Sequence, residues 1–228
     1  MFEYQKVDVV GMTYPTMEEF PHVTTIGGFI DHCARVSNPN NQSIPQNSNR
    51  LLDYLIRNQH WSPFEMASIT MKITTTRDIA RQMLRHRSFS FQEFSQRYAE
   101  VDVEEFISRQ ARMQDRSNRQ NSIPTDDKTV IANWEYEQYR VKALIAQAYS
   151  DAIKDGIAKE QARAILPEGM TPSTLYMGGT VRSWIHYCDL RRANGTQLEH
   201  VDIANKASHC LLAEVPALKG YFEDEEHS

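Results

Sequence analysis

The sequence contains few cysteines, glycines and prolines, and it has no long apolar run. There are three cysteines, nine glycines and nine prolines in 228 residues. The cysteines are odd in number, widely spaced and form no Cys-x-x-Cys pair, so neither a disulfide framework nor a zinc knuckle is expected. We expect the protein to be located in a reducing cytoplasm. No apolar run approaches the roughly 18 residues that a membrane span needs, and the N-terminus lacks a signal-peptide layout. We therefore expect no membrane association.

A surplus of positive charge is also missing. The formal net charge is −5 and the pI is about 5.9. Proteins that coat a nucleic-acid duplex normally carry a basic surplus, so we expect no nucleic-acid partner. A local basic pocket for one small anion stays compatible with this balance. The remaining composition, 40% hydrophobic and 24% charged, is that of an ordinary globular protein long enough to bury a core.

The patterned segments predict a helix-rich α+β fold with a small, mostly antiparallel sheet. Apolar and polar residues alternate over residues 67–74 (ASITMKIT), which is typical of a half-buried strand, and Val7 to Val10 form a second, shorter strand. Residues 173–181 are a strand or an irregular turn. Helices are expected over residues 29–36, 49–59, 129–155, 159–167, 182–191 and 198–214, and from Arg77 onward, where Ile79, Met83 and His86 would share one face.

The other segments read as connections. Residues 40–49 form a polar loop, and residues 109–128 form a polar excursion or flexible loop. No repeat or linker divides the chain. We predict one domain over residues 1–220, followed by an acidic tail over residues 221–228.

Several common catalytic motifs are absent from the sequence. There is no glycine-rich phosphate loop, no His-Glu-x-x-His and no close histidine cluster, so no metal site is expected. Neither Ser90 nor Ser95 lies on the glycine-flanked turn of a serine hydrolase. The cysteines have the surroundings of small core residues.

One short segment is rich in hydrogen-bond donors. Residues 85–98 read RHRSFSFQEFSQRY, with three arginines and three phenylalanines. One interpretation is a helix C-terminus, where basic side chains complement the helix dipole, followed by a loop. The other is an ordered, partly buried segment whose arginines pair with carboxylates or with a phosphate ligand. The segment by itself leaves both open.

The same segment resembles a known signature. Arg85-His86-Arg87, followed after seven residues by Ser95, matches the pattern RHR-x7-S of the flavin-dependent thymidylate synthases. Further segments resemble that family across most of the chain, from Ala34 to Glu199. They are ARVS (34–37), HWSPFEM (60–66), NRQNS (118–122), QARAILP (161–167), RSWIHYCDLR (182–191) and QLEH (197–200).

The resemblance implies a fold and a reaction. The fold would be that of the thymidylate synthase-complementing proteins. The enzyme would be an FAD-dependent methyltransferase of nucleotide biosynthesis that makes dTMP from dUMP. It would take a methylene group from methylenetetrahydrofolate and reducing equivalents from NADPH through FAD. It would be a homotetramer whose active sites lie between subunits.

The resemblance also implies roles for individual residues. The residues around dUMP would be Gln82, Arg85, Glu93, Ser95, Gln96, Arg97, Arg163 and Arg191. The residues around FAD would be Ser37, His60, Ser62, Glu65, Arg85, His86, Arg87, Gln92, Glu93, Arg182, His186 and Leu190. Arg191 would be catalytic, because a cation held against the uracil ring stabilises charge that develops during methylene transfer. Gln92, Thr180 and Gly195, on the flavin side, depart from the usual family pattern.

Two alternative functions stay open. A related enzyme could modify carbon 5 of a pyrimidine nucleotide differently, for example by hydroxymethylation, with the same nucleotide contacts. A nucleotide- or RNA-binding module could use the phenylalanines of residues 85–98 as a stacking platform. A flavin absorption band would distinguish an enzyme of this family from a binding module, and product mass spectrometry would distinguish the two enzymes.

Overall fold

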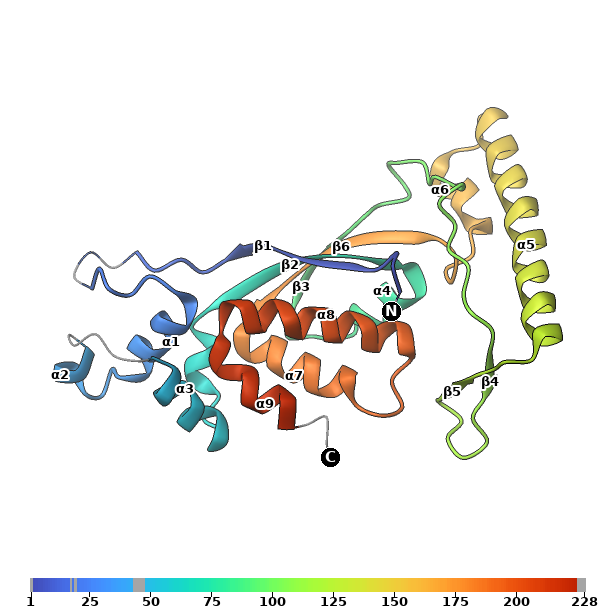
Figure 1. The fold of residues 1–228 in the computed structure, drawn as a ribbon. Helices are drawn as coiled ribbons and strands as arrows, with labels where there is room; N and C mark the ends of the chain where they lie inside the picture. Colours follow the sequence, from blue (N-terminus) through green and yellow to red (C-terminus); the bar gives the residue numbers. More distant parts are fainter. Residues whose placement is uncertain (1, 17, 19, 43–47, 225–228) are drawn as a thin grey trace.

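A four-stranded antiparallel sheet lies at the centre of the computed structural model, which describes residues 2–16, 18, 20–42 and 48–224 (Figure 1). Its strands, in the order β1-β2-β6-β3, are β1 (Lys6–Met12), β2 (Ser68–Thr76), β6 (Pro172–Thr180) and β3 (Ser90–Glu93). All three neighbouring pairs are antiparallel. The predicted α+β class with a small antiparallel sheet is therefore confirmed.

Strand β2 is the centre of the core. Its residues Ile69, Met71 and Ile73 are fully buried, as the alternating pattern predicts. Met71 and Ile73 lie opposite Met177 and Leu175 of β6, which are also fully buried. The sequence left open whether residues 173–181 form a strand or an irregular turn, and the structure decides for a strand.

Two helices lie side by side along the sheet (Figure 1). Helix α7 (Val181–Arg192) contacts β6, and helix α8 (Leu198–Glu214) contacts β1. The prediction of both helices is confirmed. Trp184 and Tyr187 of α7 are among the largest fully buried side chains, so α7 joins the sheet to α8 through aromatic packing.

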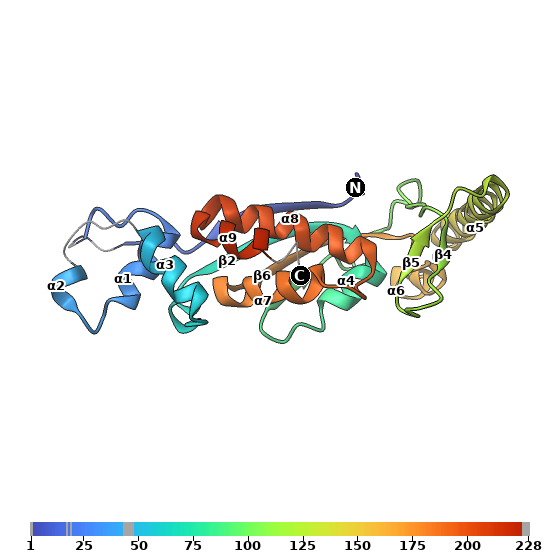
Figure 2. The same ribbon diagram turned by 60° about the horizontal axis from the view of Figure 1, so that its bottom comes forward.

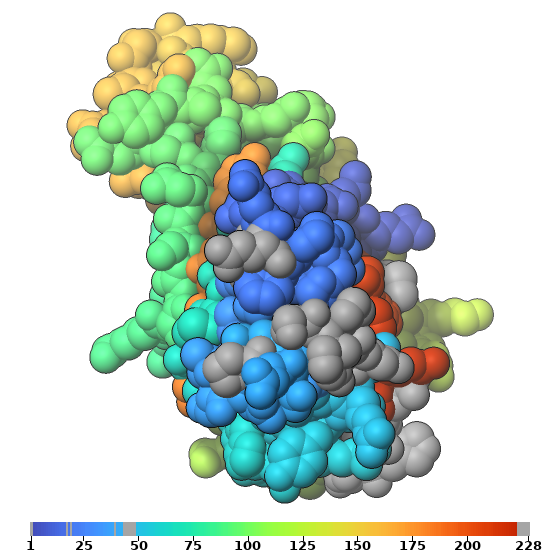
Figure 3. Space-filling model, turned by 90° about the vertical axis from the view of Figure 1, so that its left-hand side faces the viewer, coloured from blue at the N-terminus to red at the C-terminus, as the bar shows by residue number. Residues whose placement is uncertain are grey.

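The early helices form one end of the molecule, which faces the viewer in Figure 3 in blue and cyan. They are α1 (Ile26–Ala34), α2 (Pro39–Gln42), α3 (Ser48–Arg57) and the 3-10 turn η1 (Ser62–Glu65). The loop predicted over residues 40–49 is therefore partly helical, and residues 43–47 lie outside the described residues.

The C-terminal residues pack against the main core. The 3-10 turn η3 (Pro216–Leu218) is followed by helix α9 (Lys219–Asp224), and Phe222 is only 2% exposed. The domain boundary predicted at residue 220 stays a prediction. Residues 225–228 of the predicted tail lie outside the described residues.

The middle of the chain extends away from the sheet (Figures 1 and 2). It consists of the hairpin β4 (Arg112–Gln114) and β5 (Ser122–Pro124), helix α5 (Lys128–Lys154), helix α6 (Lys159–Ala162) and the 3-10 turn η2 (Arg163–Ile165). A small second core of Val101, Phe106, Tyr149 and Ala162 packs α5 against α6 and the loop that precedes the hairpin. In the part of the chain that the structure describes, no helix is both long and apolar enough to cross a membrane.

The prediction of a polar excursion or flexible loop over residues 109–128 is wrong in part, because Arg112–Gln114 and Ser122–Pro124 form this hairpin. Each hairpin strand has only three residues, too few to show a period in the sequence. The turn is held locally, since the Asp115 carboxylate accepts hydrogen bonds from the backbone of Ser117 and Asn118.

Two predictions around residues 77–98 also need correction. Helix α4 (Arg77–Met83) ends before His86, so His86 lies in the following turn instead of on the helix face with Ile79. The interpretation of residues 85–98 as a helix C-terminus followed by a loop is also wrong for Ser90–Glu93, because these residues form the edge strand β3. The interpretation of residues 85–98 as an ordered, partly buried segment is the correct one. Similarly, the helix predicted over residues 159–167 ends at Ala162 and continues only as η2.

Gly179 provides a test of how the turn after α4 is fixed. A Cβ atom on Gly179 would lie 2.4 Å from Cδ1 of Phe89, whose ring packs edge-on against Trp184 with centroids 4.8 Å apart. We expect Gly179→Ala to lower the free energy of unfolding by about 1–3 kcal/mol, because overpacking forces the ring to move. Urea denaturation of the purified protein measures this value.

The matched control is Gly220→Ala, because no atom lies within 4 Å of a Cβ placed there. That change, in helix α9, should be neutral or should stabilise by up to about 1 kcal/mol. Equal effects of the two substitutions would contradict the close packing of Phe89 on Gly179.

Candidate functional site

Many of the predicted site residues lie on α7 or on the turn that packs against it. The turn after α4 carries Arg85, His86 and Arg87, and its His86 and Phe89 rings pack against Tyr187 and Trp184 of α7. The other predicted residues lie as follows: Gln82 on α4; Gln92 and Glu93 on β3; Ser95, Gln96 and Arg97 in the next loop; Arg163 at the start of η2; Ser37 after α1; His60 before η1; Ser62 and Glu65 in η1; Arg182, His186, Leu190 and Arg191 on α7.

Arg191, the predicted catalytic residue, points toward the turn after α4. Its Nε donates a hydrogen bond to Nε2 of His86 at 2.9 Å. Burial, together with the Arg191 guanidinium, lowers the pKa of His86 to about 4. The imidazole is therefore neutral near pH 7, with its proton on Nδ1. The remaining N–H groups of Arg191 have no hydrogen-bond partner among the described residues, so they are available to a ligand.

The neighbouring Arg192 points in another direction. Its Nε donates to Oδ1 of Asn205 at 3.0 Å, its Nη2 donates to the Phe222 carbonyl at 3.3 Å, and its guanidinium lies over the Phe222 ring. Arg192 therefore ties α7 to α8 and α9. The two adjacent arginines differ in their contacts, as expected from their roughly 100° separation on a helix.

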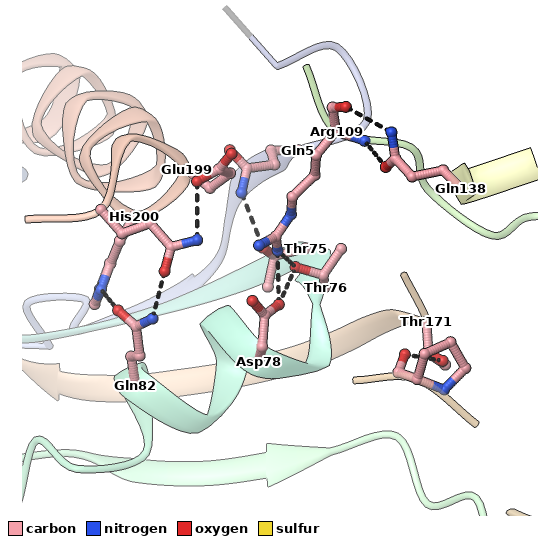
Figure 4. A network of polar contacts seen from close by, with 12 residues as sticks. Gln5, Thr75, Thr76, Asp78, Gln82, Arg109, Gln138, Thr171, Glu199 and His200 are labelled. Atoms are coloured by element: carbon pink, nitrogen blue, oxygen red, sulfur yellow. Dashed lines mark hydrogen bonds and ion pairs between the residues drawn. The ribbon is translucent and has the colours of Figure 1, made fainter. Parts of the chain in front are cut away.

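A chain of buried and half-buried polar side chains joins α4 to α8, and Figure 4 shows Gln82, Glu199 and His200 of this chain. His200 lies next to His86, with ring centroids 6.4 Å apart. Gln82 contacts His200, whose other ring nitrogen contacts the Tyr187 hydroxyl at 3.1 Å. In the other direction, Gln82 connects through Gln197 to Glu199. Glu199 and His200 are both fully buried. Gln82 is predicted from the sequence, but Gln197 and the α8 residues Glu199 and His200 are not.

A periodic signal in α8 could have identified His200. Ile203, Ala204 and Ala207 follow it at spacings of three, four and seven residues, and all are buried. This spacing places His200 on the core-facing side of the helix. A histidine there requires a polar partner inside the protein, so it was a candidate for a buried network.

Glu93 is held in place by its neighbours. Its Oε1 accepts a hydrogen bond from Ser173 Oγ at 2.8 Å and lies 3.4 Å from Nη1 of Arg77, which is only 7% exposed. Its Oε2 lies 3.5 Å from Nη1 of Arg81. The orientation of this predicted contact residue is therefore fixed by α4 and β6.

Two arginines that are predicted to lie around dUMP, Arg97 and Arg163, meet at Glu160. Arg97 Nη2 lies 3.5 Å from the Glu160 carboxylate, and Arg163 Nε donates to the Glu160 carbonyl at 3.3 Å. Gln96 next to them is 5% exposed, and its Nε2 has no partner among the described residues. Arg97 and Arg163 are therefore linked to each other through Glu160, whereas Arg191 is linked to His86.

Several predicted flavin contacts gather at the N-terminal half of α7. Arg182 forms an ion pair with Glu65, and His186 packs edge-on against Trp61 with centroids 5.6 Å apart. Arg182, His186 and Leu190 follow one another at four-residue spacing and so share a face of α7. Leu190 is 57% exposed. This face is therefore open to a ligand or a second chain.

The remaining predicted contacts are at the surface. Arg85, Arg87, Gln92, Ser37, His60 and Ser62 are exposed. Among the described residues, the Arg85 and Arg87 guanidinium groups have no carboxylate partner. These two positive charges are thus available to an anionic ligand.

The structure explains two of the departures from the family pattern. Thr180 is the N-cap of α7, where its Oγ1 accepts a hydrogen bond from the Ser183 backbone N–H at 3.1 Å. Gly195 has a φ of 90°, a conformation that side-chain-bearing residues rarely adopt. Both residues are therefore suited to the local backbone.

The buried histidines predict a pH dependence of stability. Burial, the Arg191 guanidinium and the protonated form of the His86 imidazole lower the pKa of His200 from 6.5 to about 3. As pH falls below about 6.5, His200 becomes protonated in the unfolded chain but stays neutral in the native protein, so the free energy of unfolding decreases. His200→Gln should reduce this slope by up to about 1.4 kcal/mol per pH unit. Urea denaturation between about pH 7 and about pH 5 measures it.

The exposed His209 on the same helix provides the matched control, His209→Gln. Identical slopes for the parent and His200→Gln would contradict a neutral His200 in the native protein.

Proteins of similar sequence carry consistent names. A "Probable flavin-dependent thymidylate synthase" from Paramecium bursaria Chlorella virus 1 is 48% identical over 213 residues, which cover 92% of this chain and 95% of that protein. A "Flavin-dependent thymidylate synthase" from Synechocystis is 46% identical over 196 residues, which cover 86% of this chain and 89% of that protein.

The fold is also found in solved structures. A UMP/dUMP methylase from Streptomyces cacaoi, crystallised with 5-Br dUMP, matches with a TM-score of 0.78 and 25% identity, covering 96% of this chain and 95% of that one. The sequence profile of the family described as "Thymidylate synthase complementing protein" matches residues 24–217. The chain therefore belongs to the Thymidylate synthase complementing protein (Thy1) family.

Proposed function

We propose that this protein is a flavin-dependent thymidylate synthase that converts dUMP to dTMP. Methylenetetrahydrofolate would donate the carbon, and NADPH would donate reducing equivalents through FAD. The observation that carries the proposal is Arg191: the neutral imidazole of His86 holds its Nε, and its other N–H groups have no partner among the described residues. The names of the relatives, and the share of each chain that the similarity covers, support the same function.

The nucleotide would bind through the two groups of predicted contacts. Arg97, Arg163 and the backbone around Ser95 would hold the phosphate, because a dianion favours guanidinium and N–H donors. The unpartnered Nε2 of the buried Gln96 is a further donor beside them. Glu160, which now contacts both arginines, would give up its contact with Arg97 when phosphate binds.

The residues present fit FAD by the chemistry of their donors. Its diphosphate needs cationic and hydroxyl donors, and the exposed Arg85 and Arg87, together with Ser62, offer them. His186 and Leu190 on the open face of α7 would lie against the cofactor. FAD supplies the hydride-transfer chemistry when bound, so the protein needs mainly to bind and orient its ligands.

The chain's own contribution to the chemistry would be electrostatic. Carbon 5 of the uracil must become electron-rich to accept the methylene group, and negative charge then develops on the ring. Arg191 would stabilise that charge, in the way that a preorganised donor stabilises an oxyanion. His86 would keep the guanidinium in position without competing for the charge, because the imidazole is neutral.

None of the cysteines is suited to be a nucleophile. The thiolate is the reactive form, and burial raises the pKa of Cys33 and of Cys210. Cys188 is fully buried, and its Sγ contacts the Ala204 carbonyl. Ser95 would accordingly be a ligand contact. Three free thiols also fit a reducing compartment such as the cytoplasm.

The face of α7 that carries Arg182, His186 and Leu190 supports a homotetramer with active sites between subunits. Leu190 is 57% exposed. An apolar side chain exposed beside predicted ligand contacts is suited to be covered by a second chain.

Substitution of Arg191 tests the catalytic assignment. We expect Arg191→Ala to lower dTMP formation roughly a hundredfold, a cost of about 3 kcal/mol that is typical of one lost transition-state donor. Flavin content should change much less. The assay measures dTMP by mass spectrometry, which also separates it from a hydroxymethylated product, with FAD occupancy determined for each preparation.

The control is Arg192→Ala. Because Arg192 ties α7 to α8 and α9, this change should lower the melting temperature but leave turnover per folded, flavin-loaded molecule nearly unchanged. Mild and equal losses of turnover in both variants would show that Arg191 is not catalytic.

Substitution of Arg97 tests the phosphate site. Arg97→Ala should weaken dUMP binding by about 1.5–3 kcal/mol, which is roughly 10- to 150-fold, because it removes a charge-assisted contact. FAD retention should hardly change. Calorimetry with dUMP measures the affinity. Arg140→Ala is the matched control, because Arg140 is as exposed as Arg97 and also pairs with a glutamate. An unchanged dUMP affinity in Arg97→Ala would contradict the assignment.

A further inference from the structure

In the polar network that runs from Glu199 to His200 beside Arg191, each hydrogen bond has one defined donor and one defined acceptor. We propose that Glu199 is a positioning residue that fixes the amide orientation of Gln82 and the tautomer of His200, so that Gln82 presents one defined donor and acceptor pattern to the uracil of the substrate. The part that concerns the substrate rests on the proposed function. The part that concerns the hydrogen bonds rests on the structure alone.

The donor and acceptor roles are set first at Glu199, which is fully buried. One carboxylate oxygen accepts a hydrogen bond from Nη2 of Arg112 at 2.6 Å, and the other accepts one from Nε2 of Gln197 at 3.0 Å. A carboxylate paired with a guanidinium can only accept. The Gln197 amide therefore has to turn its NH₂ group toward Glu199 and its oxygen away from it.

The orientation of the Gln197 amide in turn sets the orientation of the Gln82 amide. The Gln197 oxygen lies 2.8 Å from Nε2 of Gln82, and an amide oxygen can only accept, so the Gln82 NH₂ group donates. The Gln82 oxygen then faces Nδ1 of His200 at 3.2 Å (Figure 4). If the Gln82 amide were rotated by 180°, its oxygen would face the Gln197 oxygen, and neither could donate.

The last links concern His200 and Tyr187. Because the Gln82 oxygen accepts, Nδ1 of His200 carries the ring proton. Burial keeps His200 neutral, since its pKa falls to about 3, and Nε2 is therefore a bare acceptor. The Tyr187 hydroxyl, 3.1 Å away, donates to it. Burial also raises the pKa of Tyr187, so the hydroxyl keeps its proton. Every assignment thus follows from the carboxylate of Glu199.

This direction matters for a pyrimidine ligand. The edge of uracil alternates carbonyl acceptors with an N–H donor, so a glutamine beside it recognises the ring only with its oxygen and NH₂ group in the correct places. Within the chain of contacts, Gln82 uses one N–H and one lone pair, and it keeps one of each for a ligand. A glutamine free to rotate would lose this preference, as a mismatched donor or acceptor is left unpaired.

Two substitutions test the assignment. Glu199→Gln replaces the carboxylate by an amide. Because Arg112 can only donate, the amide oxygen turns toward Arg112 and the NH₂ group toward Gln197, which reverses the donors and acceptors along the network. The double variant Gln197→Glu/Glu199→Gln moves the carboxylate one place along the network. The carboxylate introduced at position 197 can accept both from the new amide at position 199 and from Gln82, so the original orientation of Gln82 is restored. Glu137→Gln, on the exposed surface of α5, is the control for the loss of a carboxylate.

The first measurement is solid-state ¹⁵N NMR of protein labelled in the histidine rings, which distinguishes protonated from bare ring nitrogens without any ligand. The His200 signals are identified by their loss in His200→Gln. We expect an Nδ1–H tautomer in the parent, in Glu137→Gln and in the double variant, and a mixture or an Nε2–H tautomer in Glu199→Gln. Melting temperatures confirm that each variant is folded.

The second measurement is dUMP affinity by calorimetry. We expect about tenfold weaker binding in Glu199→Gln and recovery in the double variant. An unchanged His200 tautomer in Glu199→Gln, or a folded double variant that does not recover, would overturn the inference. A parent protein that binds no dUMP would instead contradict the proposed function, and the NMR spectra would still decide the role of Glu199.

Discussion

The packing of Phe89 between Gly179 and Trp184 is the constraint on which the site depends. The absence of a side chain on Gly179 lets the ring lie against the end of β6, where a Cβ would be 2.4 Å from the ring. The turn after α4 is thereby fixed against α7. Because His86 belongs to this turn, its imidazole meets Arg191, which is 105 residues away in sequence. A flexible turn would leave Arg191 without a partner, and a free arginine samples many rotamers.

Burial of neutral polar groups is the second feature of the site. His86, His200 and Tyr187 pack against one another between α4, α7 and α8. Buried polar groups of this kind cost stability unless they are hydrogen-bonded, and here each finds a partner. The protein thus places rigid, uncharged groups next to the Arg191 guanidinium. In the proposed reaction the positive charge of Arg191 would then be directed at the substrate instead of at a neighbouring carboxylate.

The sequence predicted the elements that have a long regular pattern. Strand β2 and helices α5, α7 and α8 were recognised because their apolar residues repeat over eight or more positions. The edge strand β3 has four residues and the hairpin strands have three, so no period distinguished them from loops. The end of α4 at Met83 was missed because the following basic residues are also acceptable in a helix.

The candidate site could be predicted only as far as local motifs reach. The spacing of Arg85 to Ser95 identified the donor-rich turn, and the resemblance added Arg191 and Arg163. The partners that orient these residues were not predictable, because contacts such as Gln82 with Gln197 join positions 115 residues apart. Arg192 shows the same limit: its sequence surroundings resemble those of Arg191, but the fold gives it contacts with Asn205 and Phe222.

The most direct test of the account is a crystal structure of the protein with dUMP bound. The account predicts that Arg191 keeps its hydrogen bond to His86 while its other N–H groups contact the uracil ring. It also predicts that Arg97 exchanges Glu160 for the phosphate. A nucleotide bound away from Arg191, or an Arg191 that leaves His86 without touching the ring, would contradict it.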